Sequence, residues 1–297
     1  MEESITPETA TGMAAWKQAV RNYWPLWAGF LILAIPTIIN LAQEVWTMEI
    51  GAHGPIVLAT GLWLLSQRLG DLRASSNGPS WGLALLGILI AIPLYIFGRA
   101  YNFISLEALA VYGAMVAIML RIYGLRSSLI HFFPFLYLAF LVPPPGWLID
   151  QATSPLRSFV SYISTELLHS LGYPIAREGI TMFIAQYQLL VEDACAGMNS
   201  IVGLTAVTLF YIYVIHRASW RYCLLLTAFI IPVAVLTNII RVIALILITY
   251  YWGDAAAQGF LHMSAGIVLF AVALLIVFSL DEVIQRIIAY RRKRKAA

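Results

Sequence analysis

Residues 221–250 read RYCLLLTAFIIPVAVLTNIIRVIALILITY, and this run decides the class of the protein. After Arg221 it holds a single charged residue, Arg241. A membrane-spanning helix needs about 20 mostly apolar residues, so the run is long enough to cross a bilayer. At a rise of about 1.5 Å per residue it is too long for one straight span, and we expect Pro232 to kink it.

The rest of the chain has the same character. Its 297 residues are 61% hydrophobic and 11% charged, with a mean hydropathy of +0.83, whereas soluble domains carry roughly 25% charged residues. The sequence predicts an all-α, polytopic membrane helical bundle of about eight transmembrane helices. The eight apolar stretches are residues 24–43, 53–68, 80–99, 103–121, 128–146, 195–215, 221–250 and 259–281.

Charged residues between the stretches predict the orientation, because Lys and Arg concentrate on the cytoplasmic side. The basic run 291–295 places the C-terminus inside, and eight spans then place the N-terminus inside with Lys17 and Arg21. The outer connections hold mostly acidic residues, and Arg99 is the exception. The predicted acidic outer residues are Glu44, Glu49 and Asp254.

The predicted organisation is a cytoplasmic N-terminal segment at 1–23, a transmembrane domain at 24–281 and a basic cytoplasmic tail at 282–297. The tail directly follows an apolar helix, which favours anionic lipid over nucleic acid as its partner. The first residues are polar and lack a basic region followed by an apolar one, so we expect no cleavable signal peptide.

Residues 147–194 are predicted to lie outside and to be more than a loop. Apolar residues recur at helical spacing from Trp147 to Leu171, which predicts an amphipathic helix in the interface plane that ends at Gly172. Residues 180–191 are rich in β-branched and aromatic side chains and predict a short hairpin with its turn at Ala185 and Gln186, before the sixth span.

Cys195 is the first candidate for chemistry. It follows Glu192 and Asp193 and precedes Gly197 at the start of the sixth stretch, where the N–H groups of a helix N-terminus favour a thiolate. The alternative interpretation, which we prefer for Cys223, is a small hydrophobic residue in an apolar helix.

Arg241 and His262 are the other two candidates. Arginine in mid-span costs about 2.5–3.5 kcal/mol on insertion scales, so Arg241 needs a functional reason or a structural ion pair. Asn238, three residues earlier, shares its face. His262 opens the eighth stretch, where it is either functional or an ordinary interfacial histidine.

The predicted topology brings these candidates together. Cys195 and His262 start helices at the outer face, and Arg241 lies about nine residues, or about 13 Å, from the outer end of its helix. We therefore predict an outer-leaflet pocket lined by these three residues. Further candidates for its lining are Asn238, Glu192, Asp193 and His53.

The motifs resemble the exosortase/archaeosortase family over residues 24–281. The cysteine segment 191–198, with the sequence VEDACAGM, resembles the family's cysteine box, although Ala196 stands where many members have serine. The other matching pieces are His53-Gly-Pro55, Leu141-Val-Pro-Pro-Pro145, Leu171-Gly-Tyr-Pro174, Asn238-Ile-Ile-Arg-Val242 and His262.

The resemblance implies a membrane cysteine peptidase or transpeptidase of the bacterial inner membrane, with its active site facing the periplasm. Its partners would be membrane proteins with C-terminal sorting tails of the PEP-CTERM type (a motif, a transmembrane helix and a basic cluster) and an unknown acceptor. It implies a link to protein export and to extracellular polysaccharide and biofilm. Cys195 would be the nucleophile, Arg241 would stabilise the oxyanion and His262 would act as general acid and base.

Two other functions compete with this interpretation. A small transporter would use Arg241 to bind an anion, but the sequence shows no repeat and no pair of interrupted helices in matching halves. A structural subunit of a polysaccharide export assembly is the other. The sequence has no HExxH or CxxC motif, so we expect no metal, and we expect no cofactor.

Overall fold

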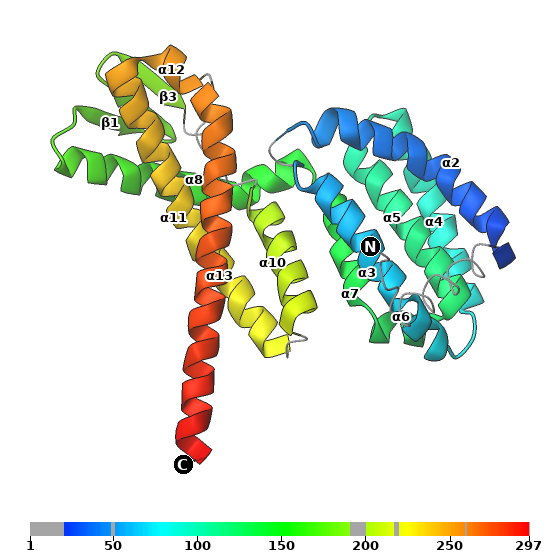
Figure 1. Cartoon of the computed structure of the whole chain (residues 1–297). Helices are drawn as coiled ribbons and strands as arrows, with labels where there is room; N and C mark the ends of the chain where they lie inside the picture. Colours follow the sequence, from blue (N-terminus) through cyan, green and yellow to red (C-terminus); the bar gives the residue numbers. More distant parts are fainter. Residues whose placement is uncertain (1–20, 49–50, 191–199, 217–219, 259, 297) are drawn as a thin grey trace, which may run out of the picture. The chain divides into compact units, whose positions relative to one another are not determined.

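The computed structural model describes residues 21–48, 51–190, 200–216, 220–258 and 260–296. The chain folds as two compact units, Met1–Pro145 and Gly146–Ala297 (Figure 1). The boundary falls after the proline run 143–145, where the missing N–H groups and restricted backbone of proline stop a helix from continuing.

The first unit is helical throughout the part that the structure describes. Helices α4 and α5 pack along each other, α2 lies on α5, and α3 lies on α7 (Figure 1). Buried side chains of α3, α5 and α7 form its core. The elements are α2 (Trp24–Asn40), a π-helical turn (Leu41–Val45), α3 (Gly54–Ala74), α4 (Trp81–Ala100), α5 (Ile104–Tyr123), α6 (Leu125–Ile130), α7 (Phe133–Leu138) and a 3-10 turn (Ala139–Leu141).

Much of the surface of this unit is apolar. Leu85, Leu89 and Ile96 of α4 are each 61% exposed, and α2 exposes a similar row. Soluble monomers rarely expose contiguous apolar surface of this extent, whereas lipid tails solvate it without cost. These outer faces are therefore lipid-facing surfaces.

Four helices of the described residues are long and apolar enough to cross a membrane, or five if the interrupted pair Phe133–Leu141 and Gly146–Ser170 counts as one span. The four are Trp24–Val45, Trp81–Ala100, Ile104–Tyr123 and Ala228–Trp252. The predicted helical membrane bundle agrees with this architecture, while the predicted number of eight spans is not confirmed.

The predicted fifth stretch, 128–146, is not one helix. Helix α6 ends at Ile130 and α7 begins at Phe133. Pro134 occupies the first turn of α7, where its missing N–H leaves no helical hydrogen bond unmade, so the sequence suits a new helix start there rather than a continuation of α6. The mean hydropathy of the stretch does not reveal the break, because apolar side chains stand on both sides of it.

Arg99, the exception among the predicted outer charges, has a partner. Its Nη1 lies 2.9 Å from Oε1 of Glu107, whose side chain is only 3% exposed. The Thr37 hydroxyl donates to the same oxygen at 2.8 Å. Since these residues lie on α4, α5 and α2, one buried carboxylate joins three helices.

Replacing Glu107 with glutamine should lower the stability of the first unit by about 1–3 kcal/mol, because Arg99 loses its counter-charge and the charge-assisted hydrogen bonds to the carboxylate become neutral ones. Thermal unfolding in detergent measures this loss. The exposed pair Glu282–Arg286 supplies the control, since Glu282→Gln should change stability by less than about 1 kcal/mol. Equal effects of the two variants would contradict the structural role of Glu107.

The second unit combines helices with a small sheet (Figure 1). Its first helix, α8, spans Gly146–Ser170, so the predicted amphipathic helix is confirmed in type and nearly in extent. It ends as expected before Gly172, which has a φ of +88° that glycine adopts without strain. The position of α8 in the plane of the membrane stays a prediction.

The sheet has three antiparallel strands in the order β1-β2-β3. They are β1 (Ile175–Glu178), β2 (Thr181–Ile184) and β3 (Tyr187–Leu190). The predicted hairpin is confirmed as β2 and β3, with Ala185 at a φ of +50° in its turn. The prediction missed β1, because its sequence IARE has little β-propensity and its strand conformation depends on pairing with β2.

Long helices complete the second unit. They are α10 (Ser200–His216), α11 (Trp220–Trp252) and α13 (Phe260–Ala296), with the short α12 (Asp254–Gln258) between the last two. Helix α11 continues through Pro232. Helix α13 has 37 residues and is about 55 Å long, more than the hydrocarbon core of about 30 Å. It is therefore longer than one crossing of the hydrocarbon core requires, and residues 291–295 form its basic end.

Candidate active site

Helix α11 runs through the interior of the second unit and contributes to both of its buried clusters. The C-terminal half of α11 packs against α8 and the sheet, with Val242, Leu245 and Ile246 in one apolar cluster. The N-terminal half packs against α10 and α13, with Ile230 and Val233 in a second cluster. The candidate residues Asn238 and Arg241 lie on the stretch of α11 between the residues of these two clusters.

Arg241 and Asn238 are both in the interior. Arg241 is 2% exposed and Asn238 is 3% exposed, and their spacing of three residues puts them on one face of α11. Because α11 extends to Trp252, Arg241 lies eleven residues, or about 16 Å, from that end. A guanidinium at this depth is desolvated, and its interaction with an anion is correspondingly strong.

Aromatic residues that are distant in the sequence cluster at the C-terminal end of α11. The Tyr173 and Tyr251 hydroxyls are 3.0 Å apart, and the ring of Tyr173 also meets Tyr250 at a centroid distance of 5.5 Å. Trp252 beside them is 72% exposed. Tyr and Trp gather at membrane–water interfaces, so this cluster indicates where α11 leaves the bilayer.

The predicted nucleophile Cys195, together with Glu192 and Asp193, lies outside the described residues. The segment that holds it begins after β3, which ends at Leu190, and leads into α10, which begins at Ser200. Both β3 and α10 contact α11. Both ends of the segment are therefore joined to elements that pack beside α11.

His262 is the third residue of α13, and its side chain also lies outside the described part. Helix α12 joins the end of α11 to the start of α13, and the two long helices pack along each other (Figure 1). The first turn of α13 is therefore near the Trp252 end of α11, and Arg241 is deeper along the neighbouring helix.

His53 belongs to the first unit. It precedes α3, and its Nε2 lies 3.4 Å from the carbonyl oxygen of Phe140 in the same unit. The predicted place of His53 in the pocket stays a prediction.

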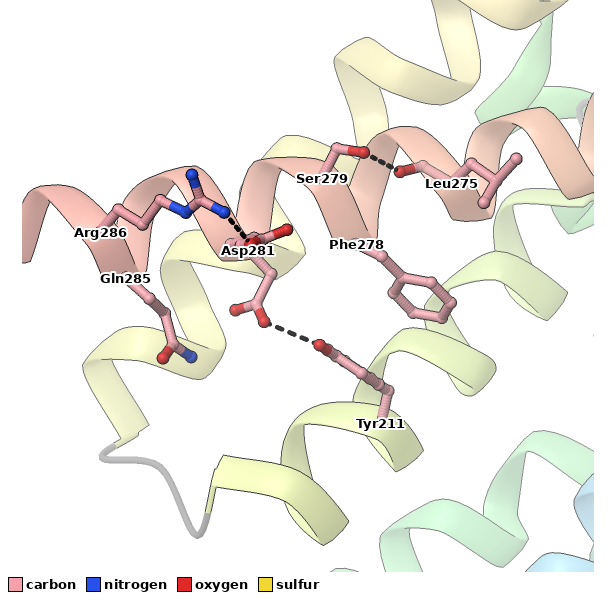
Figure 2. A pocket seen from close by; sticks show the side chains of 8 residues that line it. Tyr211, Leu275, Phe278, Ser279, Asp281, Gln285 and Arg286 are labelled. Atoms are coloured by element: carbon pink, nitrogen blue, oxygen red, sulfur yellow. Dashed lines mark hydrogen bonds and ion pairs between the residues drawn. The ribbon is translucent and has the colours of Figure 1, made fainter.

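A hollow between α10 and α13 was not anticipated (Figure 2). Asp281, which is 3% exposed, accepts a hydrogen bond from the Tyr211 hydroxyl at 2.9 Å. The space beside them has a volume of about 620 Å³. A carboxylate within an apolar helix is the sequence signal that was available, because such residues are costly in membranes. The lining is Tyr211, Leu275, Phe278, Ser279, Asp281, Glu282, Gln285 and Arg286.

A metal centre finds no support in the part of the chain that the structure describes, where no three His, Cys, Asp or Glu side chains are grouped to hold an ion. The chemistry available there is that of a buried guanidinium, an amide and hydroxyl groups. Such groups stabilise anions and bind peptide groups.

A family model for the transmembrane exosortases (Exosortase_EpsH) matches residues 45–279. The chain belongs to the transmembrane exosortase family. This exosortase family member is accordingly a multi-pass membrane protein, as its lipid-facing helices also indicate. The match includes most of both units and all three residues of the predicted site. No curated protein and no solved structure matches the chain.

Proposed function

We propose that this exosortase is a cysteine peptidase or transpeptidase that removes C-terminal sorting tails from membrane-anchored proteins. Each tail carries a PEP-CTERM type motif, a transmembrane helix and a basic cluster. The reaction takes place at the outer face of the bacterial inner membrane, and the link to export of polysaccharide and biofilm matrix belongs to the same proposal.

The observation that carries the proposal is the buried Arg241 on α11, in a chain whose family match includes Cys195 and His262. A fixed cation in a desolvated site is suited to the oxyanion of acyl transfer, where one good donor is worth about 10²–10³ in rate. Cys195 comes between β3 and α10 in the sequence, and both of these elements contact α11.

The proposed reaction has two halves. His262 accepts the proton of the Cys195 thiol, and the thiolate attacks the scissile carbonyl while Arg241 stabilises the resulting oxyanion. The C–N bond then breaks, His262 protonates the leaving amine, and an acyl-enzyme thioester remains. Water or an acceptor amine resolves the thioester and restores the thiol.

The depth of Arg241 adds a requirement to this reaction. The guanidinium lies about 16 Å from the end of α11. The scissile peptide bond must therefore enter the outer leaflet to reach it and cannot stay in bulk water. The scissile bond therefore sits close to the substrate's own transmembrane helix. A tail in which a long polar spacer separates the motif from the helix is expected to be a poor substrate.

Thiol accessibility tests the orientation and the nucleophile together. In cells with an intact inner membrane, a membrane-impermeant maleimide should label Cys195 and slow the processing of a tail-bearing reporter protein. Cys223 lies 29 residues, or about 43 Å, from the Trp252 end of α11, so it should not react from outside. Labelling of Cys223 alone, or processing that survives complete labelling of Cys195, would exclude the proposed arrangement.

A further inference from the structure

Helix α8 buries a row of hydroxyl groups. Ser161 and Ser164 are fully buried, and the hydroxyl oxygen of Thr165 is buried as well. None of these oxygens has a hydrogen-bond partner among the described residues. Their spacing of three and four residues places them on one side of the helix. Buried polar groups are almost always paired, so three orphaned oxygens within five residues need an explanation.

Several other hydroxyls on helices of this chain donate to a carbonyl oxygen of their own helix. Thr153 of the same α8 donates to the carbonyl oxygen of Ile149 at 2.7 Å, and Thr249 of α11 donates to that of Leu245 at 2.9 Å. This back-bonding is the ordinary solution for Ser and Thr in helices. The hydroxyls of the α8 row make no such bond.

The row lies in the seam between α8 and the rest of the second unit. Helix α8 contacts α11, β1 and β2, and it crosses α11 in Figure 1. Val160 and Leu168, on either side of the row, pack in the same cluster as Val242 of α11. Close packing alone does not account for the row, since alanine allows the same approach without burying an oxygen.

We propose that Ser161, Ser164 and Thr165 bind the main chain of the substrate peptide where it enters between α8 and α11. A hydroxyl both donates and accepts, which matches the N–H and C=O groups of an extended chain whatever its side chains. Ser161 and Thr165 are four residues apart on α8, or about 6 Å. Equivalent groups on one edge of an extended peptide repeat every two residues, at about 6.6 Å.

This inference rests on the proposed function and identifies where its peptide substrate binds. In the closed seam the hydroxyls bury their oxygens without partners, and a peptide that separates α8 from α11 supplies those partners. The row thereby makes this seam easier to open than a contact between purely apolar side chains. The three residues are positioned to bind peptide groups and take no part in bond breaking.

The test uses the full chain in nanodiscs with Cys195→Ala as background, and a fluorescent synthetic peptide with a PEP-CTERM type motif and transmembrane helix as probe. The triple variant Ser161→Ala, Ser164→Ala, Thr165→Val should bind the peptide about tenfold more weakly, since each lost hydrogen bond is worth a factor of about two to twelve. Its Tm should be unchanged or higher, because it no longer buries orphaned hydroxyls. Ser158→Ala, at an exposed position of α8, is the matched control and should bind as the background does.

Unchanged affinity of the triple variant would overturn the inference and assign the row to packing or bound water. A fall in Tm together with affinity would overturn it as well, because the hydroxyls would then be structural. Absence of peptide binding to the background protein would have the same meaning. A different result would overturn the proposed function, namely processing of the reporter by the Cys195→Ala protein. In that case a tenfold difference in peptide affinity would still support the role of the hydroxyl row.

Discussion

Processing of a tail-bearing reporter should fall by on the order of 10³-fold or more when Cys195 is replaced by alanine, because the covalent route through the thioester is removed. Cys195→Ser should also be strongly impaired, since a serine hydroxyl is a far weaker nucleophile than a thiolate at neutral pH. The measurement is the rate at which the tail is released from the reporter in membranes that contain equal amounts of each variant.

Cys223→Ala is the matched control for this result. Cys223 lies near the start of α11, and as a small apolar residue it should tolerate alanine with a change in rate of less than about twofold. Undiminished processing by Cys195→Ala would end the cysteine mechanism. Equal losses in both variants would point to general destabilisation instead.

Replacing Arg241 with methionine should lower kcat/KM by about 10²–10³, which is the effect of removing one oxyanion donor. Arg241→Lys should recover part of the loss, because it keeps the charge but not the planar fork of donors. The loss should appear mainly in kcat, since the guanidinium acts on charge that develops only in the transition state.

Thermal stability distinguishes this role from a structural one. If the loss of activity reflects the missing oxyanion donor, the Met variant should lose activity while its Tm stays close to that of the parent. Arg286→Met, in an exposed pair with Glu282 on α13, is the control and should process normally. Full activity of Arg241→Met, or a large fall in its Tm, would make Arg241 a structural residue.

Local patterns in the sequence were sufficient for several elements. The amphipathic period from 147 to 171 predicted α8, and Gly172 predicted its end. The β-rich run at 180–191 predicted the hairpin of β2 and β3. Each of these elements is encoded in consecutive residues, and neighbours along the chain are enough to recognise it.

Other elements depended on information that consecutive residues lack. The break between α6 and α7 interrupts an apolar run without changing its hydropathy. Strand β1 exists because β2 pairs with it. For the candidate site, spacing alone gave the shared face of Asn238 and Arg241, but neither the hydroxyl row of α8 opposite α11 nor the extension of α11 to Trp252 followed from it.

By itself the sequence determined that this is a membrane protein, because apolar runs of about 20 residues need a lipid environment. It also determined that a cysteine, an arginine and a histidine are the candidates for chemistry. Only the tertiary structure decided which groups from distant parts of the chain come into contact. Glu107 neutralises Arg99 from another helix, and Ser161 and Ser164 are buried in a seam formed by elements distant in sequence. Burial and pairing belong to contacts between elements, and one-dimensional patterns do not specify those contacts.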